Sequence, residues 1–208
     1  MIITEISKFK GSTMCVVFDS GARLYIHSSI VAEYGLREGL DVSEEAAEEI
    51  AEANDYRRAR ERALYLLDGR DYGFREMYDK LTANYSGDIS LRVCKYLAEL
   101  GLINDRRYAE LRARELFEIK HVGMFKAKME LRRRGIPDEI IAEVLEPYAD
   151  EEEAFARLEQ LVEKKYERYL VNEKGVKKVK SALQRQGYSY DEINAVLDLY
   201  DLEFDEEQ

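Results

Sequence analysis

The chain has 208 residues, of which 36% are charged, and its net charge of −11 argues against a protein that coats bare DNA through bulk electrostatic attraction. No apolar run reaches the roughly 20 residues that span a bilayer, and the start of the chain lacks the pattern of a secretory signal. The two cysteines, Cys15 and Cys94, stand apart in the sequence, which predicts free thiols in a reducing cytoplasm.

Residues 1–42 open the chain with three short runs rich in β-branched residues, at 2–6, 13–18 and 23–26. Glycine, serine and aspartate separate these runs, a spacing typical of a small antiparallel β-meander. We expect a short helix to follow at 28–36, with a glycine near its end. Together these elements form an N-terminal β extension.

The pattern becomes helical at Ser43, whose side chain suits the N-cap position. Glu44 and Glu45 follow in the first turn, where carboxylates interact favourably with the helix dipole. Apolar residues then recur at helical spacing as far as Gly69. The sequence therefore predicts one long helix over 44–69.

The rest of the chain repeats one pattern three times. Gly73, Gly123 and Gly175 are each followed eight residues later by a leucine, and the apolar residues between recur at helical spacing. Each copy is predicted to form a short helix with one buried stripe, made of Phe74, Met77 and Leu81, of Met124, Ala127 and Leu131, and of Val176, Val179 and Leu183.

A longer helix is predicted before each of these glycines, at 44–69, 105–120 and 150–172, and a further apolar helix after it. Such stacked units predict a mostly α protein, an elongated curved solenoid behind the β-meander. The acidic residues 201–208 are expected to form a frayed tail. The predicted three-helix repeats cover 43–104, 105–149 and 150–200.

Capping residues mark the expected helix starts. In the third helix of each repeat the start is marked by Asp88, by Pro137 in the first turn, and by a capping box of Ser189 with Glu192. Between the first two repeats, Asn104 or Asp105 is expected to cap the next helix.

The same residues carry a family resemblance. The ordered strings resemble those of RecX proteins over about residues 56–200, and weakly over the first 55 residues. The family often has serine at Gly73 and leucine at Met77, and these departures are mild. The matching strings are Arg62-Ala63-Leu64-Tyr65-Leu66-Leu67, Arg70, Arg75-Glu76-Met77, Lys80-Leu81, Gly101-Leu102-Ile103-Asn104-Asp105, Tyr108-Ala109, Gly123, Leu131, Gly135-Ile136 and Ile140.

The resemblance implies a non-enzymatic regulator of RecA recombinase in DNA repair, homologous recombination and the SOS response. RecX proteins lie in the helical groove of the RecA–DNA filament and touch successive protomers. They oppose filament growth and suppress strand exchange, ATP hydrolysis and co-protease activity. We therefore expect a monomer whose partner is the RecA filament, and the chain's acidity makes us expect direct DNA contact to be weak or absent.

A candidate partner-binding face follows from the repeat offset of 52 residues between the second and third copies. This offset places Lys126 over Lys178, Lys128 over Lys180 and Arg133 over Arg185. The first repeat breaks the pattern. The predicted binding residues are Lys126, Lys128, Arg132, Arg133, Arg134, Lys177, Lys178, Lys180 and Arg185, with Arg106, Arg107, Arg112 and Arg114 as an extension.

Three interpretations of these cations stay open at this point. They are ordinary solvated helix faces, contacts for acidic patches on the filament, or contacts for DNA phosphates. Arginine forks suit carboxylates and phosphates alike, so charge alone does not separate the last two.

Catalytic constellations are missing from the sequence. Neither His27 nor His121 has neighbours that make a triad or a metal site, and no phosphate-cradling glycine loop occurs. We expect no cofactor and no metal. Tyr108 is expected to pack between repeats rather than to stack on a base.

Two other functions are compatible with parts of this sequence pattern. A helical-repeat scaffold that holds a protein ligand would have the same fold. A helix-turn-helix regulator would use the turn at Leu100-Gly101-Leu102 and bind duplex DNA in a sequence-specific way.

Overall fold

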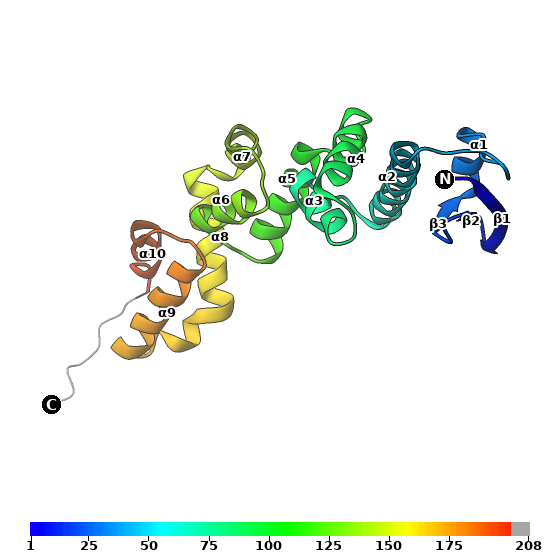
Figure 1. Ribbon diagram of the computed structural model, residues 1–208. Helices are drawn as coiled ribbons and strands as arrows, with labels where there is room; N and C mark the ends of the chain where they lie inside the picture. Colours follow the sequence, from blue (N-terminus) through cyan, green and yellow to red (C-terminus); the bar gives the residue numbers. More distant parts are fainter. Residues whose placement is uncertain (201–208) are drawn as a thin grey trace. The chain divides into compact units, whose positions relative to one another are not determined.

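The structure is a computed structural model that describes residues 1–200, and the predicted acidic tail at 201–208 lies outside the described residues. The chain forms two compact units (Figure 1). One comprises Met1–Asp71 with Met77–Leu102, and the other comprises, within the described residues, Tyr72–Glu76 with residues 103–200. The fold is mostly α-helical with a small N-terminal sheet, as the sequence predicts.

The N-terminal extension is an antiparallel sheet of three strands in the order β1-β2-β3. The strands are β1 (Ile3–Lys10), β2 (Thr13–Phe18) and β3 (Arg23–His27), and the short helix α1 (Ser28–Glu33) follows. The meander and the helix are therefore confirmed. The helix ends earlier than expected because Gly35 adopts a φ of 58°, which takes the chain out of the helical conformation.

The long helix α2 (Glu44–Gly69) has the predicted bounds. Ser43 caps it, because its Oγ accepts the backbone N–H of Ala46 at 3.1 Å. Asn54, buried in the middle of α2, joins the helix to the sheet: its Oδ1 accepts the N–H of His27 at 3.0 Å. A polar side chain can be buried here because the edge of β3 satisfies it.

The helices α3 (Phe74–Thr82) and α4 (Gly87–Glu99) follow α2. The start predicted at Asp88 is wrong by one position. Ser86 is the N-cap, because its Oγ accepts the N–H of Ile89 at 3.3 Å, and Asp88 lies in the first turn.

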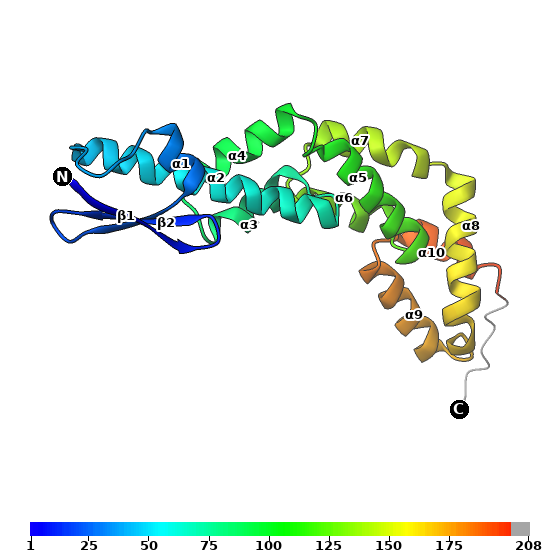
Figure 2. The same ribbon diagram turned by 90° about the vertical axis from the view of Figure 1, so that its right-hand side faces the viewer.

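The second unit holds two further groups of three helices. The first group is α5 (Asp105–Arg114) with the π-helical turn η1 (Glu115–Ile119), then α6 (Met124–Arg133) and α7 (Asp138–Leu145) with the 3-10 turn η2 (Glu146–Tyr148). The second group, seen from the side in Figure 2, is α8 (Glu151–Leu161) with the turns η3 (Val162–Tyr166) and η4 (Glu167–Tyr169), then α9 (Glu173–Arg185) and α10 (Tyr190–Leu197).

Each group of the second unit encloses its own apolar core. The buried side chains of the first core include Ala127, Leu131 and Ile141, and those of the second include Val179, Leu183 and Ile193. The predicted stripes therefore do face the interior. Burial of these stripes, rather than helix propensity, supplies most of the stability of such short helices.

The third copy departs from the glycine alignment. Gly123 is the N-cap residue of α6. In α9 the N-cap is Asn172, whose Oδ1 accepts the N–H of Gly175, so Gly175 lies inside the first turn of the helix. Across residues 1–200, no helix is both long and apolar enough to cross a bilayer.

Candidate functional site

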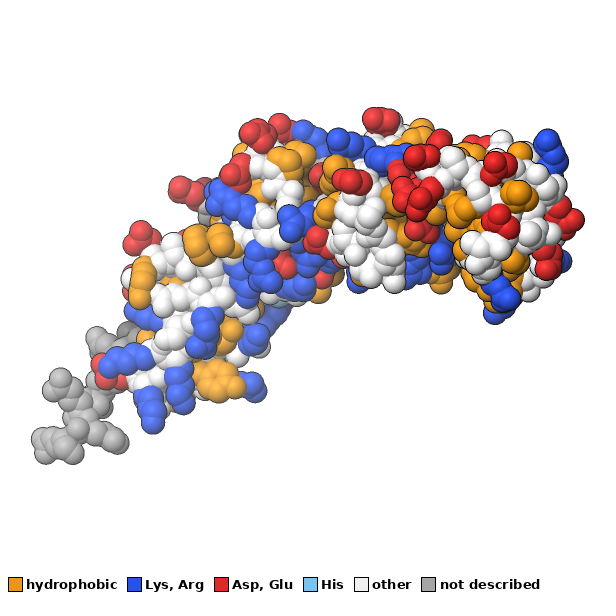
Figure 3. All heavy atoms as spheres, viewed as in Figure 1, with side chains coloured by type: hydrophobic (Ala, Val, Ile, Leu, Met, Phe, Trp, Pro, Cys, Tyr) orange, Lys and Arg blue, Asp and Glu red, His pale blue; other side chains and the backbone are white. Residues whose placement is uncertain are grey.

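Positive charge in the second unit gathers on the middle helix of each group. Helix α6 has one acidic residue, Glu130, and four basic residues, Lys126, Lys128, Arg132 and Arg133. The neighbouring helix α7 carries acidic side chains and no basic one. Figure 3 shows Lys and Arg side chains over α6 and α9.

The cations of α6 do not share one face. Ala127 and Leu131 are buried and define the core side of the helix. Lys126 and Arg133 are seven residues apart, so they project in nearly the same direction. Lys128 lies roughly 160° around the helix from Lys126, since each residue turns the helix by about 100°.

The same division holds on α9, whose core side is marked by the buried Val179 and Leu183. Lys178 and Arg185 are exposed and project to one flank. Lys180 lies on the other flank, where its Nζ donates to Asn194 Oδ1 on α10 at 2.8 Å. The two copies are therefore equivalent in direction, but each copy splits its cations between two flanks.

The first flank carries four cations, which we call the basic strip: Lys126, Arg133, Lys178 and Arg185. Arg133 is 78% exposed, and its one ion pair within residues 1–200 is a long one of 3.7 Å with Glu130. Among residues 1–200, neither Lys178 nor Arg185 has an ion-pair partner. These cations can therefore meet an external anion without first breaking a strong internal contact.

The basic strip is continuous because α6 and α9 meet end to end. The N–H of Gly123 donates to Gln186 O at 2.9 Å, and Lys126 Nζ donates to Gln186 Oε1 at 3.1 Å. Gln186 directly follows Arg185, so the end of α6 that carries Lys126 meets the end of α9 that carries Arg185. Nothing in the sequence pattern marked Gln186 as the link.

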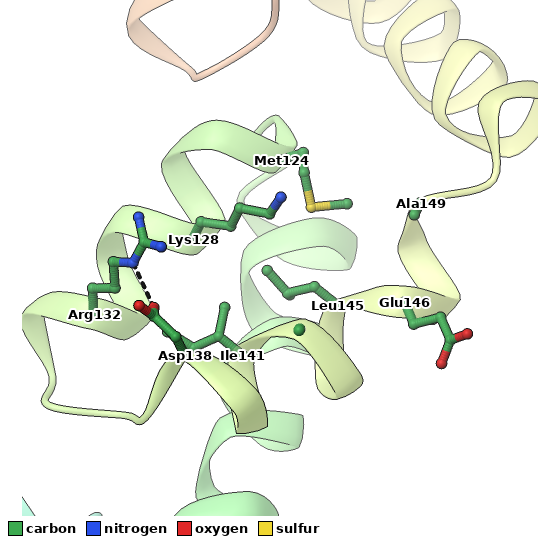
Figure 4. Close-up of a pocket in the computed structure, with 9 residues that line it drawn as sticks. Met124, Lys128, Arg132, Asp138, Ile141, Leu145, Glu146 and Ala149 are labelled. Atoms are coloured by element: carbon green, nitrogen blue, oxygen red, sulfur yellow. Dashed lines mark hydrogen bonds and ion pairs between the residues drawn. The ribbon is translucent and has the colours of Figure 1, made fainter.

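The second flank of α6 faces α7 across a cavity of about 300 Å³ (Figure 4). Met124, Ile141 and Leu145 supply its apolar lining, and Lys128 and Arg132 stand at its edge. Arg132 Nε donates to Asp138 Oδ1 at 2.7 Å, and this hydrogen bond and the charge of Asp138 raise the pKa of Arg132. We call this site the α6/α7 groove.

Two predicted binding residues are engaged elsewhere. Arg134, only 27% exposed, turns inward, where its Nη1 donates to Tyr108 Oη at 2.9 Å and its Nη2 to Glu130 Oε1 at 3.1 Å. Lys177 remains exposed but pairs with Glu173 one turn away at 3.3 Å. The idea that Arg134 thickens the basic row is therefore not what the structure shows.

The predicted extension along α5 is also held internally. Arg106 pairs with Glu143 on α7, Arg112 pairs with Glu115, and Arg114 pairs with Glu118 at 3.9 Å. The Arg112 hydrogen bonds to Tyr108 and Glu115 outweigh desolvation and raise the pKa of Arg112.

Tyr108 packs between helices of different repeats, as predicted, and is 2% exposed. Its hydroxyl donates to Glu76 Oε2 at 2.9 Å. Asn104 caps α5, whereas Asp105 caps a different helix, because its Oδ1 accepts the N–H of Phe74 at 2.7 Å. Asn104 and Asp105, the two residues considered for one N-cap, therefore cap two different helices, α5 and α3.

Tyr188 closes the contact between the last two groups of helices. Its hydroxyl donates to His121 O at 3.1 Å, and His121 has a positive φ of 49°. Burial raises the pKa of Tyr188 to about 12, with Glu192 and Tyr166 adding to the shift and Arg157 opposing it.

Because the folded-state pKa of Tyr188 lies above its ordinary value of about 10, its contribution to stability is complete below pH 10. That contribution falls as the pH rises from about 10 to about 12, by about 2 kcal/mol. We expect Tyr188→Phe, which loses the hydrogen bond, to be about 1 kcal/mol less stable than wild type near pH 8. Near pH 12 we expect it to be the more stable protein.

Urea unfolding followed by circular dichroism at both pH values checks this reversal. Tyr65→Phe is the control, because Tyr65 is 71% exposed and should keep its rank at every pH. A constant difference between Tyr188→Phe and wild type across this range would contradict the expectation.

Within residues 1–200, no group of three or more His, Cys, Asp or Glu side chains is placed to hold a metal ion. Cys15 and Cys94 are both buried free thiols, and burial raises the pKa of Cys94 to about 11. A thiol with so high a pKa is a weak nucleophile at neutral pH. The charged surfaces of α6 and α9 are the candidate site.

Comparison with known families identifies two regions of the chain. A model of the second three-helix domain of RecX matches residues 104–145, and a model of the third three-helix domain matches residues 151–197. Those ranges contain both α6 and α9.

Curated relatives carry the description regulatory protein RecX. The protein from Clostridium acetobutylicum is 30% identical over 93% of this chain and 92% of its own length. That from Trichlorobacter lovleyi is 32% identical over 65% of this chain and 91% of its own length. That from Clostridioides difficile is 27% identical over 99% of this chain and 98% of its own length.

Two solved structures are similar to this one. A crystal structure of a regulatory protein RecX covers 95% of this chain and 98% of its own, with a TM-score of 0.70 at 21% identity. The crystal structure of RecX from Lactobacillus salivarius covers 73% of this chain and 99% of its own, with a TM-score of 0.62 at 28% identity.

Proposed function

The chain belongs to the RecX family of regulatory proteins, and from that premise we propose that it is a negative regulator of RecA recombinase. It binds the RecA–DNA filament in the helical groove and opposes filament growth. In doing so it suppresses strand exchange, ATP hydrolysis and co-protease activity. Any change in ATP hydrolysis belongs to the partner, because the regulator itself performs no chemistry.

The observation that carries this proposal is the basic strip. It presents equivalent cations, Lys126 with Lys178 and Arg133 with Arg185, from two consecutive groups of helices. A surface that repeats along a protein suits a partner that also repeats, as the subunits of a filament do. The chain's net charge of −11 argues against bare DNA as the main contact.

The division into repeats at 43–104, 105–149 and 150–200 is part of the proposal. In it, the second and third repeats hold the partner, and residues 1–42 support the first repeat. The protein works as a monomer in the cytoplasm, where reducing conditions suit the two free thiols.

The ATPase rate of RecA from the same organism on single-stranded DNA, measured as this protein is titrated in, tests the proposal. We expect a dose-dependent fall at well below one regulator per RecA protomer. An unchanged rate with excess folded protein and an intact filament would overturn the filament proposal in favour of a protein-binding scaffold. Tight, sequence-specific binding to duplex DNA without RecA would favour the helix-turn-helix alternative.

A further inference from the structure

The α6/α7 groove differs from the equivalent place in the third repeat. In the third repeat Lys180 is occupied, because it donates to Asn194 on the facing helix at 2.8 Å. The offset of 52 residues puts Lys128 at the place of Lys180 and Ala142 at the place of Asn194. Alanine has no acceptor for the amine, and among residues 1–200 Lys128 has no hydrogen-bond or ion-pair partner.

The open groove combines an apolar lining with unsatisfied donors. Figure 4 shows Met124, Ile141 and Leu145 around the cavity, with Lys128 extending towards Met124. Arg132 stands beside Lys128 and uses only Nε for Asp138, so its two Nη atoms remain available. A ligand here must therefore bring an apolar group and, close to it, an anion.

An anionic protein segment meets that demand better than a nucleic acid does. The sugar–phosphate backbone has no aliphatic side chain for the apolar lining. A single carboxylate beside one leucine or phenylalanine would pair with Lys128 while its apolar neighbour covers the cavity.

We propose that the α6/α7 groove binds an acidic segment of a partner protein, seating one apolar side chain in the cavity and one carboxylate between Lys128 and Arg132. This inference rests on the proposed function in one respect: the segment is carried by the protein subunits of the filament. The groove then adds specificity to the basic strip, which attracts anions of any kind.

Fluorescence polarisation tests the groove directly, with the full chain and the fluorescein-labelled peptide Gly-Glu-Asp-Leu-Glu-Phe-Asp-Gly as the probe. Ala142→Asn copies the third repeat, closing the cavity and engaging Lys128, and should weaken binding about tenfold. Lys128→Met keeps the aliphatic stem, removes the charge and should weaken binding about fivefold. A peptide with serine in place of leucine and phenylalanine should bind about tenfold more weakly to wild type.

Matched controls separate the groove from general charge. Ala156→Asn introduces the same side chain at an exposed alanine of α8 outside the cavity lining, and Lys164→Met removes an exposed lysine far along the sequence. Both should bind the probe within about twofold of wild type. Absence of probe binding to wild type, or equal binding by Ala142→Asn and wild type, overturns the inference.

The chain's own residues Asp201-Leu202-Glu203-Phe204-Asp205 have the same chemistry as the probe. If the probe binds only after deletion of 201–208, the occupant is the chain itself and the partner-segment proposal is overturned. The RecA ATPase assay separates the groove proposal from the proposed function. If wild type and Ala142→Asn inhibit RecA equally, the groove proposal is refuted and the filament proposal stands. If the probe binds the groove but the protein does not inhibit RecA, the filament proposal is refuted and the groove proposal stands.

Discussion

Reversing three cations of the basic strip, Arg133, Lys178 and Arg185, to glutamate should raise the concentration that halves RecA ATPase activity by about 100-fold. The reason is that each substitution turns an attraction to an acidic surface into a repulsion. Together these changes cost about 3 kcal/mol, which is about 100-fold in affinity. A titration of the triple variant into RecA on single-stranded DNA measures the shift.

The matched control reverses three cations on the sheet, Lys8, Lys10 and Arg23. These side chains are exposed, and among residues 1–200 they have no ion-pair partner, so the net charge changes equally and the fold is spared. We expect this control to inhibit within about threefold of wild type, because long-range charge is screened beyond roughly 10 Å. Equal loss in both triple variants would assign the effect to net charge and refute the basic strip as the contact surface.

Gly123→Ala should lower the free energy of unfolding of the second unit by about 3 kcal/mol. A Cβ on Gly123 would lie 2.3 Å from Gly187 O and 2.6 Å from Tyr188 N, both backbone atoms. The two groups of helices must then separate, which costs the hydrogen bond from Gly123 N–H to Gln186 O as well as close packing. Urea unfolding followed by circular dichroism measures the loss.

Gly69→Ala is the control for this substitution. A Cβ on Gly69, the last residue of α2, meets nothing within 4 Å, and alanine favours helix more than glycine does. We expect a stability within about 0.5 kcal/mol of wild type, or a small gain. If Gly123→Ala were as stable as Gly69→Ala, the end-to-end contact of α6 and α9 would not exist in solution.

The effects expected for the basic strip and for Gly123 depend on the same contact between α6 and α9. Gly123 allows α6 to approach α9 closely enough for Lys126 to reach Gln186, and this approach joins the two halves of the basic strip. A variant at Gly123 that still folds should therefore also inhibit RecA less well. The stability defect and the functional defect then share a cause.

Local signals along the chain determined which elements form, although several predicted ends were off by a few residues. Ser43 predicted the start of α2, and the spacing of glycine and leucine predicted α3, α6 and α9, because caps and helical periodicity depend on neighbours within a few residues. The repeat offset paired Lys126 with Lys178 and Arg133 with Arg185, but it put Lys128 and Lys180 on the same face, whereas helical geometry puts them on the other flank.

Side-chain roles depended on which helix covers each flank, and that is set by residues far away in the sequence. Arg134 turned inward because Tyr108 offers its hydroxyl, and Lys128 stayed available because the facing position on α7 is an alanine. Asp105 capped α3, 31 residues before it, rather than its own helix. Helical spacing gives a side chain's direction from its own axis, whereas its partner, its burial and its availability to a ligand arise only when helices pack together.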